Sequence, residues 1–478
     1  MRILVMLASC FLVAGCGDDG PGAPARLPRV SDVGGPKLTH PQLVPIFFSA
    51  DPDVETLTNF SRWVVTSSWF DEVGAEYGIG TGSVLGVVHK PVPAPDAITD
   101  TQIVDLLYLG LADGSLPKAP AGGAGEVLYV FHFPSHTVVT SFDDKSCDVF
   151  SGYHGSARRN GVELAYAVVA SCFDFSPSLT EVESRELITS HELIEAATDP
   201  FPSNQPGFRL RDPTSSWFAL GGEVGDLCEG TKASIWREAG FVAQRSWSNA
   251  AAAAGDPCVP SPAGGRYYNV VADGGALPRI APGSTKAIGL TGWSTSTTTD
   301  WMMSAVSAKD GDATLTLAAS TLNAGKTTTL SITVPPTATK GTALRLFVFS
   351  AQSQTDFQVL PVLAIVDDPC STFTRCETCA SHGCGFCTTT GRCETVGASG
   401  SAESSCPASS FATWPGSCPG FCGGHSASCT ECASQPGCGA CTAGGVTKCL
   451  EASHDYSHPA TSTCAYADWS FTPGYCPQ

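Results

Sequence analysis

The segment Thr180–Pro200 reads TEVESRELITSHELIEAATDP and has the spacing of one long, well-marked helix. Thr180 followed three residues later by Glu183 is a capping-box pattern, which predicts the start of the helix. Pro200 cannot continue a helix, so we expect the helix to end near Ala197. This helix is the element around which we arrange the first part of the chain.

Further elements are predicted on the N-terminal side of this helix. Helical spacing covers Val54–Tyr77, and a second capping box, Thr99 with Gln102, predicts a helix through Leu111. Apolar runs typical of strands lie at Leu43–Phe48, Val84–His89, Val127–Phe133, Thr137–Phe142 and Val162–Val169. Mixed strands and helices predict an α+β domain over residues 36–262.

Within the predicted helix, His191 and Glu195 are one turn apart and therefore lie on the same face. This is the geometry by which an H-E-x-x-H motif holds zinc, while the intervening glutamate polarises the metal-bound water. Here Glu195, an oxygen ligand, replaces the second histidine, and Glu192 occupies the general-base position. We expect His191 and Glu195 to bind zinc and Glu192 to be catalytic.

A third ligand is needed, and an acidic segment, GEVGDLC at 222–228, follows about thirty residues later. Glu223 or Asp226 could complete the site, and the spacing does not choose between them. Asp199 could orient a ligand through a hydrogen bond. Carboxylate-rich sites also suit calcium, in which case His191 is a bystander. The calcium ligands would then be Asp199, Asp212, Glu223 and Asp226.

The charge of this ligand set limits its chemistry. One histidine and two carboxylates leave zinc without net charge, whereas two histidines and one carboxylate leave it at +1. A less positive centre acidifies water less, so hydroxide would be scarcer at neutral pH. The remaining alternative is a helix whose His and Glu side chains face solvent or pair locally.

The motif order carries a family resemblance. H-E-L-x-E-A-x-T-D-P, then G-E-x-G-D-x-C-E-G, then Trp247-Ser248-Asn249 and Cys258 resemble secreted bacterial proteins related to plant EXORDIUM (phosphate-induced) proteins. Upstream, GYHG at 152–155 and AYAVV at 165–169 fit the same pattern, so the resemblance spans most of residues 40–260. It implies a zincin-like region, although the plant relatives are regarded as extracellular growth-related proteins without an established activity. By this resemblance alone, His154 is an additional candidate ligand.

The N-terminus predicts export and lipid attachment. Met1-Arg2, the apolar run Ile3–Ala14 and the sequence Ala14-Gly15-Cys16 resemble a bacterial lipobox, in which the Cys16 thiol takes a diacylglycerol. The alternative is an ordinary signal peptide cut nearby. We expect a leader at 1–16, a flexible tether at 17–35 and an envelope protein anchored to its membrane through the lipid, at the outer membrane or cell surface. The net charge of −19 argues against nucleic-acid binding.

The 22 cysteines predict disulfides. Apart from Cys10 in the leader and Cys16, twenty remain, an even number in an oxidising compartment. Four lie in the first large region, where we expect Cys147 to pair with Cys172 and Cys228 with Cys258. The second pair would hold Glu223 and Asp226 near the helix.

Residues 263–367 predict a β-sandwich. Thr- and Val-rich alternating runs are separated by Gly, Pro and Asn and resemble bacterial immunoglobulin-like modules, which commonly act as spacers. The runs are Thr314–Ala318, Thr327–Val334, Leu344–Phe349 and Phe357–Val366.

Residues 368–478 form an internal repeat of two copies, 368–420 and 421–478, with eight cysteines in each. The cysteines are Cys370, Cys376, Cys379, Cys384, Cys387, Cys393, Cys406 and Cys418, then Cys422, Cys429, Cys432, Cys438, Cys441, Cys449, Cys464 and Cys476. Their order resembles plexin–semaphorin–integrin (PSI) modules, but Phe386 and Ala440 stand where family members often carry Trp. The alternative to disulfides is that the C-x-x-C pairs bind zinc, but few charged residues or histidines lie near them, which favours disulfides.

Two functions fit this organisation. The first is a metal-dependent hydrolase, most simply a metallopeptidase, with Glu192 as the base. The second is a non-catalytic surface protein that binds an extracellular protein or wall polymer and has a structural metal or none. The missing second histidine and the adhesion-like tail favour the second function. Glu192 favours the first, because a structural site has no use for a general base.

Overall fold

The structure is a computed structural model that describes most of the chain from residue 27 onward. Residues outside the description are 1–26, 120–125, 142–143, 160–161, 173–178, 203–204, 211–216, 218–219, 230–233, 262–266, 273–277, 296–298, 310, 354–355, 368–369, 398–399, 402–403, 405, 408–409, 414, 436, 453–458, 461–462, 466–467, 471–475 and 477–478. The predicted lipobox with Cys16 and the candidate calcium ligand Asp212 therefore lie outside the described residues. Across the described residues, no helix combines the length and apolar character needed to span a membrane.

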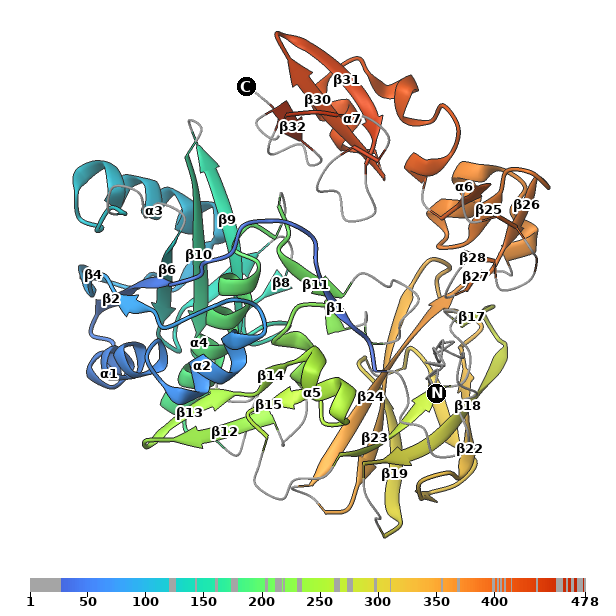
Figure 1. Ribbon diagram of the computed structural model, residues 1–478, viewed down its shortest axis with the longest axis horizontal. Helices are drawn as coiled ribbons and strands as arrows, with labels where there is room; N and C mark the ends of the chain where they lie inside the picture. The colour runs from blue at the N-terminus through green and yellow to red at the C-terminus, as the bar shows by residue number, and fades with distance from the viewer. Residues whose placement is uncertain are drawn as a thin grey trace, which may run out of the picture.

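The N-terminal part is built on a six-stranded mixed sheet (Figure 1). Its centre consists of β2 (Gln42–Ser49), β6 (Val127–Phe133) and β10 (Val162–Ala170), which run parallel. The short strands β3 (Ser83–Val84) and β4 (Val88–Pro93) pair parallel with β2. At the other edge, β9 (Gly152–Arg159) pairs antiparallel with β10.

Helices cover both faces of this sheet, because alternate residues of the central strands point to opposite sides. Leu128 and Val130 of β6 belong to the core shared with α1 (Val54–Val64), α2 (Ser68–Ala75) and α4 (Glu181–Thr198). Tyr129 and Phe131 belong to the core under α3 (Asp100–Asp113). The predicted mixture of strands and helices is confirmed. The sequence pattern did not predict that the central strands run parallel or that helices cover both faces of the sheet.

Small sheets and short helices extend the α4 side of the domain. They are β1 (Val30–Asp32) with β11 (Phe208–Leu210), β12 (Ile235–Glu238) with β13 (Phe241–Gln244), β14 (Ser246–Trp247) with β15 (Cys258–Val259), the helix α5 (Asn249–Ala254) and the 3-10 turn η4 (Asp226–Cys228). A further small sheet, of β5 (Ala97–Thr99), β7 (Val138–Ser141) and β8 (Asp144–Lys145), lies on the other side, where Ile98 and Val139 join the core under α3. The core on the α4 side continues through Trp247 and Val259 into the next domain.

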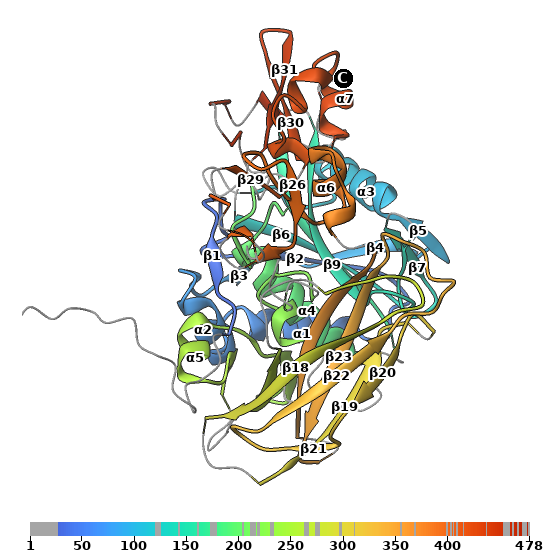
Figure 2. The same cartoon turned by 90° about the vertical axis from the view of Figure 1, so that its right-hand side faces the viewer.

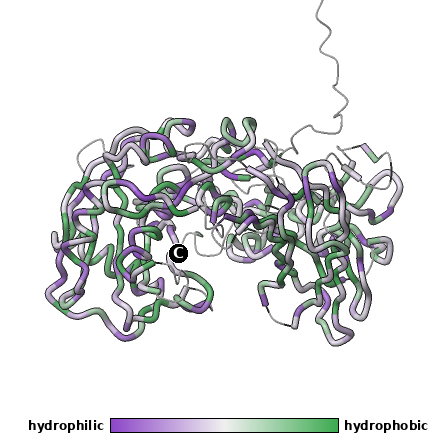
Figure 3. Tube along the Cα trace, turned by 90° about the horizontal axis from the view of Figure 1, so that it is seen from below, coloured by the Kyte–Doolittle hydropathy of each residue, from purple (hydrophilic) through white to green (hydrophobic). Residues whose placement is uncertain are grey.

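The next domain is a sandwich of two sheets (Figure 2). One sheet has the order β16 (Tyr268–Ala272), β18 (Thr285–Ser294), β22 (Thr327–Thr333) and β20 (Thr314–Leu317). The other has the order β17 (Arg279–Ile280), β24 (Phe357–Val366), β23 (Ala343–Ala351), β19 (Trp301–Ser307) and β21 (Thr321–Leu322). Leu290 and Leu330 from one sheet share a core with Leu346 and Leu360 from the other. Hydrophobic segments run through both halves of the molecule in Figure 3.

Two small cysteine-rich modules follow, at the top of the molecule in Figures 1 and 2. The first contains α6 (Cys376–Ser381) and short strands from β25 (Gly385–Cys387) to β29 (Phe411–Ala412), and the second contains α7 (Cys429–Ala433), β30 (Cys438–Ala443), β31 (Val446–Glu451) and β32 (Trp469–Ser470). All sixteen cysteines form disulfides, and in both modules the first pairs with the fourth, the second with the eighth, the third with the sixth and the fifth with the seventh.

The shared connectivity confirms the internal repeat and the disulfide interpretation. Cys370, Cys384 and Cys393 lie close enough together to suggest a metal cluster, but each is already in a disulfide. Zinc binding by the tail is therefore wrong, since zinc needs free thiolates. The ten disulfides among the described residues indicate an oxidising, extracytoplasmic setting.

Candidate metal centre

Helix α4 brings the predicted motif residues together. Its capping box at Thr180 and Glu183 is formed, and the helix packs beside β9 and β10. His191 Nε2 lies 3.2 Å from Glu195 Oε2, one turn further along the helix. Asp226 Oδ1, from the turn η4, lies 3.7 Å from the same imidazole nitrogen. These three residues offer ligand atoms that are all within 4.8 Å of one another.

The acidic segment approaches the helix through backbone hydrogen bonds. Glu195 Oε1 accepts from the amides of Gly225 (3.1 Å) and Asp226 (2.9 Å), which leaves Oε2 facing His191. Only glycine permits this approach, because a Cβ added at Gly225 would lie 2.8 Å from Glu195 Oε1 and 3.0 Å from His191 Nδ1. A Cβ added at Gly221 would lie even closer to Asp226 Oδ2, and Gly221 has a φ of +109°, which favours glycine.

His154 enters the site from β9. Its Nε2 donates to the carbonyl of Asp199 (3.1 Å), and its Nδ1 lies 3.5 Å from Glu192 Oε2 and 3.6 Å from Glu195 Oε2. His154, Glu192 and Glu195 form a second possible ligand group, which shares Glu195 with the first. Glu192 Oε2 is buried and has no hydrogen-bond partner among the described residues.

Glu223 and Asp199 are held by Arg209 on the side of the site. Arg209 pairs with Glu223, and its Nε donates to Asp199 Oδ2 at 2.7 Å. Asp199 Oδ1 also accepts from the amide of Gly207, so the carboxylate of Asp199 holds Arg209, and it is the backbone carbonyl of Asp199 that accepts from a histidine, His154. Glu223 lies 3.9 Å from His154 Nε2, so Asp226, and not Glu223, joins His191 and Glu195.

Negative charge exceeds positive charge in this cluster. Burial raises the pKa of Glu192, and burial together with Glu195 and Glu223 raises that of Asp226 well above its usual range. Burial and neighbouring carboxylates raise the pKa of Glu223 to about 7, despite the opposing effect of His154. Burial opposes protonation of both histidines, but Glu195 raises the pKa of His191 and Glu223 that of His154 well above the ordinary value. A divalent cation would supply the missing positive charge.

The donor set can be compared with what zinc and calcium require. Ligand atoms of a tetrahedral zinc site lie about 3.4 Å from one another, close to the separations of Glu195 and Asp226 from His191. Imidazole nitrogen suits zinc, whereas calcium takes six to eight oxygens. Two of the predicted calcium ligands, Asp199 and Glu223, are paired with Arg209 instead. His191 and Asp226 are 11% and 21% exposed in their side chains, so the site opens on their side.

Comparisons with known proteins give no family. No protein-family model matches the chain, and no curated protein does. Solved structures with partial similarity include domains 4 and 5 of the S-layer protein SbsC (14% identity, 22% of this chain, 54% of that chain, TM-score 0.17). Another is the Bacteroides ovatus GH5 xyloglucanase in complex with a XXXG heptasaccharide (11% identity, 21% of this chain, 19% of that chain, TM-score 0.15). A third is the CsuC–CsuE chaperone–tip adhesion subunit complex of Acinetobacter baumannii (17% identity, 23% of this chain, 61% of that chain, TM-score 0.16). This chain thus spans about half of the first S-layer fragment.

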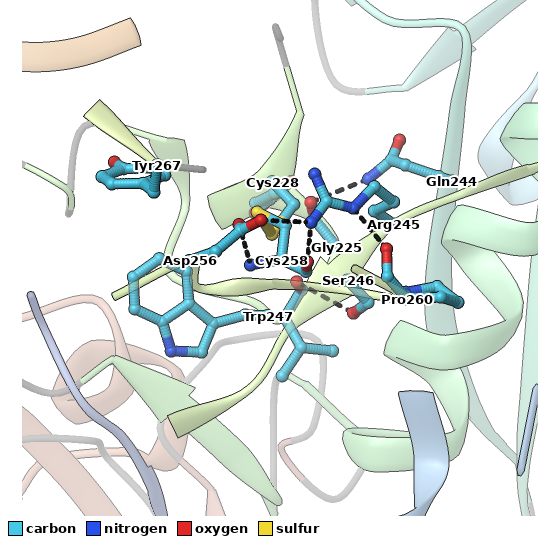
Figure 4. Close-up of a disulfide and its surroundings, with 12 residues drawn as sticks. Gly225, Cys228, Gln244, Arg245, Ser246, Trp247, Asp256, Cys258, Pro260 and Tyr267 are labelled. Carbon is cyan, nitrogen blue, oxygen red and sulfur yellow. Dashed lines mark hydrogen bonds and ion pairs between the residues drawn. A yellow bond between two sulfur atoms is a disulfide. The ribbon is translucent and has the colours of Figure 1, made fainter. Parts of the chain in front are cut away.

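Both predicted disulfides of the N-terminal domain are confirmed. Cys147 pairs with Cys172, and Cys228 pairs with Cys258. Figure 4 shows the second disulfide beside Gly225 and Arg245. Arg245 donates to the carbonyls of Cys258 and Pro260 and pairs with Asp256. The disulfide and this arginine therefore fix the C-terminal end of η4 against β15.

Sequence patterns missed the strand β9 and two residues of the site, Arg209 and Gln244. The strand β9 is polar and half-buried, so it has no run of alternating apolar residues. Arg209 carried no motif signal, although a basic residue close to several acidic ones could have prompted a search for an ion pair. Gln244 of β13 accepts from His191 at 3.1 Å, and a buried glutamine has no sequence signature.

Proposed function

We propose that this protein is a metal-dependent hydrolase of the zincin-like kind, most simply a metallopeptidase. The observation that supports it most directly is the convergence of His191, Glu195 and Asp226 within 4.8 Å, next to a buried Glu192 carboxylate. In this proposal His191, Glu195 and Asp226 hold zinc, and Glu192 is the general base.

The surroundings of Glu192, His154 and Arg209 suggest a role for each of them in this reaction. Bound zinc would supply Lewis acidity toward a substrate carbonyl. Glu192, whose pKa is raised by burial, accepts a proton from water and can return it to a leaving group. His154 lies 3.5 Å from Glu192 and restrains its carboxylate, while Arg209 keeps Glu223 away from the zinc ligands.

An extended peptide is the substrate class that the surroundings favour. Among the described strands, β9 is paired with β10 on one side, and we propose that an extended peptide adds along its other edge. This edge is next to the base, since a Cβ added at Gly152 would lie 2.8 Å from Glu192 Oε1.

The rest of the chain would place this activity at the cell envelope. We propose a lipid anchor on Cys16, an immunoglobulin-like sandwich as a spacer, and two PSI-like modules that contact an extracellular protein or wall polymer. The equal disulfide connectivity of the modules supports two copies of one unit. The motif order around α4 supports a relationship to EXORDIUM-type proteins.

The test uses the mature full chain and its Glu192→Gln variant on a mixture of quenched fluorescent peptides. The variant should keep zinc and lose about 100-fold or more of kcat/KM, because a general base contributes 10²–10⁴. Glu72→Gln, an exposed glutamate on α2, is the matched control and should retain full activity.

The possible results separate the two functions. Zinc with peptide cleavage that depends on Glu192 supports the hydrolase. Zinc or calcium without any cleavage favours the surface-binding protein with a structural metal. A protein that binds neither ion removes the metal centre from both functions.

A further inference from the structure

We propose that Gln244 is a positioning residue of the metal centre: it fixes which nitrogen of His191 faces the ligand group and couples His191 to the loop that carries Asp226. This inference rests on the proposed metal site and assigns a residue that no motif identified.

The side chain of Gln244 is held at both ends. Its Oε1 lies 3.1 Å from His191 Nδ1, and its Nε2 donates to the carbonyl of Gly225 at 2.8 Å. Only the amide nitrogen can donate to a carbonyl, so the oxygen must face the imidazole. His191 Nδ1 therefore carries a hydrogen, and Nε2, which faces Glu195 and Asp226, is the nitrogen that would bind the metal.

The backbone of Gln244 is equally fixed. Its amide donates to Ser190 Oγ at 2.9 Å, and its carbonyl accepts from Trp69 Nε1 at 2.9 Å. Two residues earlier, the amide of Val242 donates to Glu186 Oε2 at 3.0 Å. Gln244 is 4% exposed, so these contacts are shielded from water.

These contacts form a regular match between helix α4 and strand β13. Glu186 and Ser190 are four residues apart on the helix, a rise of about 6.0 Å, and Val242 and Gln244 are two residues apart on the strand, a rise of about 6.6 Å. Because these two distances agree, side chains one turn apart on the helix can bind backbone amides two residues apart on the strand. The next position on the helix after Ser190 is His191, and the register places Gln244 beside it.

The consequence is that one side chain controls two ligands. A histidine ligand is oriented by the partner of its other nitrogen, and loss of such a partner lowers metal affinity about 10- to 100-fold. Gln244 supplies this partner to His191 and, through Gly225, also fixes the residue before Asp226. Loss of the amide would release both ligands together.

The experiment measures zinc affinity by competition with a chromophoric chelator for the full chain, Gln244→Met and Gln244→Glu. Met has nearly the same length but no strong acceptor, and Glu keeps an acceptor for the His191 N–H while it loses the donor to Gly225. We expect about a 10- to 100-fold loss for Gln244→Met and a smaller loss for Gln244→Glu, which keeps the contact with His191 and loses only the one with Gly225. The absorption spectrum of bound Co²⁺ should change in the first variant and be preserved in the second.

Gln358→Met, at a buried position on β24 of the sandwich, is the matched control and should bind zinc as the wild type does. Wild-type affinity in Gln244→Met, or equal losses in the Met and Glu variants, would overturn the role of Gln244 and leave the metal centre intact. If Gln244→Met does not fold, Gln244→Ala takes its place, and wild-type zinc affinity in that variant overturns the role. If the wild type binds no zinc, the proposed function fails together with this inference.

Discussion

Gly225 is the residue at which the metal centre is most sensitive to added volume. Its φ of −76° and ψ of −48° are open to any residue, so alanine meets no backbone penalty there. The added methyl group would nevertheless lie 2.8 Å from Glu195 Oε1 and 3.0 Å from His191 Nδ1. We predict that Gly225→Ala lowers zinc affinity by about tenfold or more, as measured by chelator competition.

Gly423→Ala is the control for this substitution, because no atom lies within 4 Å of the added Cβ there. It should leave zinc affinity unchanged. Unchanged affinity in Gly225→Ala as well would show that the loop can retreat from the helix without loss of the ligands.

At the scale of single residues, the sequence predicted the ligands that one helical turn brings together. His191 and Glu195 follow from the helix period alone, and Glu192 follows from its place between them. The choice between Glu223 and Asp226 could not be made, because it depends on Arg209, which lies on another strand and removes Glu223 by pairing with it. His154 came only from a resemblance, and its contact with Glu192 depends on the pairing of β9 with β10.

Helix α4 is anchored to the domain by a buried ion pair. Arg185 is fully buried and bonds Asp51 through both terminal nitrogens, at 2.9 and 2.7 Å. Removal of one partner leaves a buried charge without compensation, which typically costs about 3–5 kcal/mol. We predict a loss of this size in the free energy of unfolding of Arg185→Met, measured with urea. Arg62→Met, at an exposed arginine of α1, should change it by less than about 0.5 kcal/mol.

The contact between α4 and β13 depends on pH, because one of its partners is the Glu186 carboxyl group. Burial raises the pKa of Glu186 from 4.5 to about 7, so the folded protein retains a proton that the unfolded chain has lost. The stability associated with this proton is present below pH 4.5 and is lost as the pH rises toward 7. Glu186→Gln cannot lose it, and its amide oxygen can still accept from Val242.

We therefore predict that Glu186→Gln unfolds like the wild type at pH 4 and is more stable at pH 8, by up to about 3 kcal/mol. Urea unfolding at a series of pH values measures the difference. A difference that is constant with pH would show that Glu186 does not titrate in this range.

At the scale of elements, the sequence predicted the capped helix starts correctly, but it did not predict where one helix is divided or where several strands lie. Both predicted capping boxes form, at Thr99 and Thr180. The helical segment predicted at Val54–Tyr77 is divided, because Ser67 caps a second helix through the amide of Phe70. In the sandwich, the four predicted runs are strands, while five others were missed. The apolar residues of β18 and β19 are interrupted by Gly, Thr and Ser, and β16, β17 and β21 are short.

The whole molecule depends on cross-links where its cores are small. Apolar clusters in the two cysteine-rich modules consist largely of the cysteines themselves. We predict that thiol titration of the denatured, unreduced mature chain finds no free cysteine among the twenty that form disulfides. After reduction, the modules should lose protection from proteases, because units of this size rarely fold without disulfides. Several reactive thiols before reduction would contradict the pairing.

The central claim is that His191, Glu195 and Asp226 hold a metal ion. The most direct test is zinc content by mass spectrometry after dialysis of the full chain and of its Asp226→Asn and Glu223→Gln variants. We predict one zinc ion per chain in the wild type and in Glu223→Gln, and a loss of bound zinc in Asp226→Asn. A wild type without zinc, or zinc lost from Glu223→Gln and retained in Asp226→Asn, would contradict it.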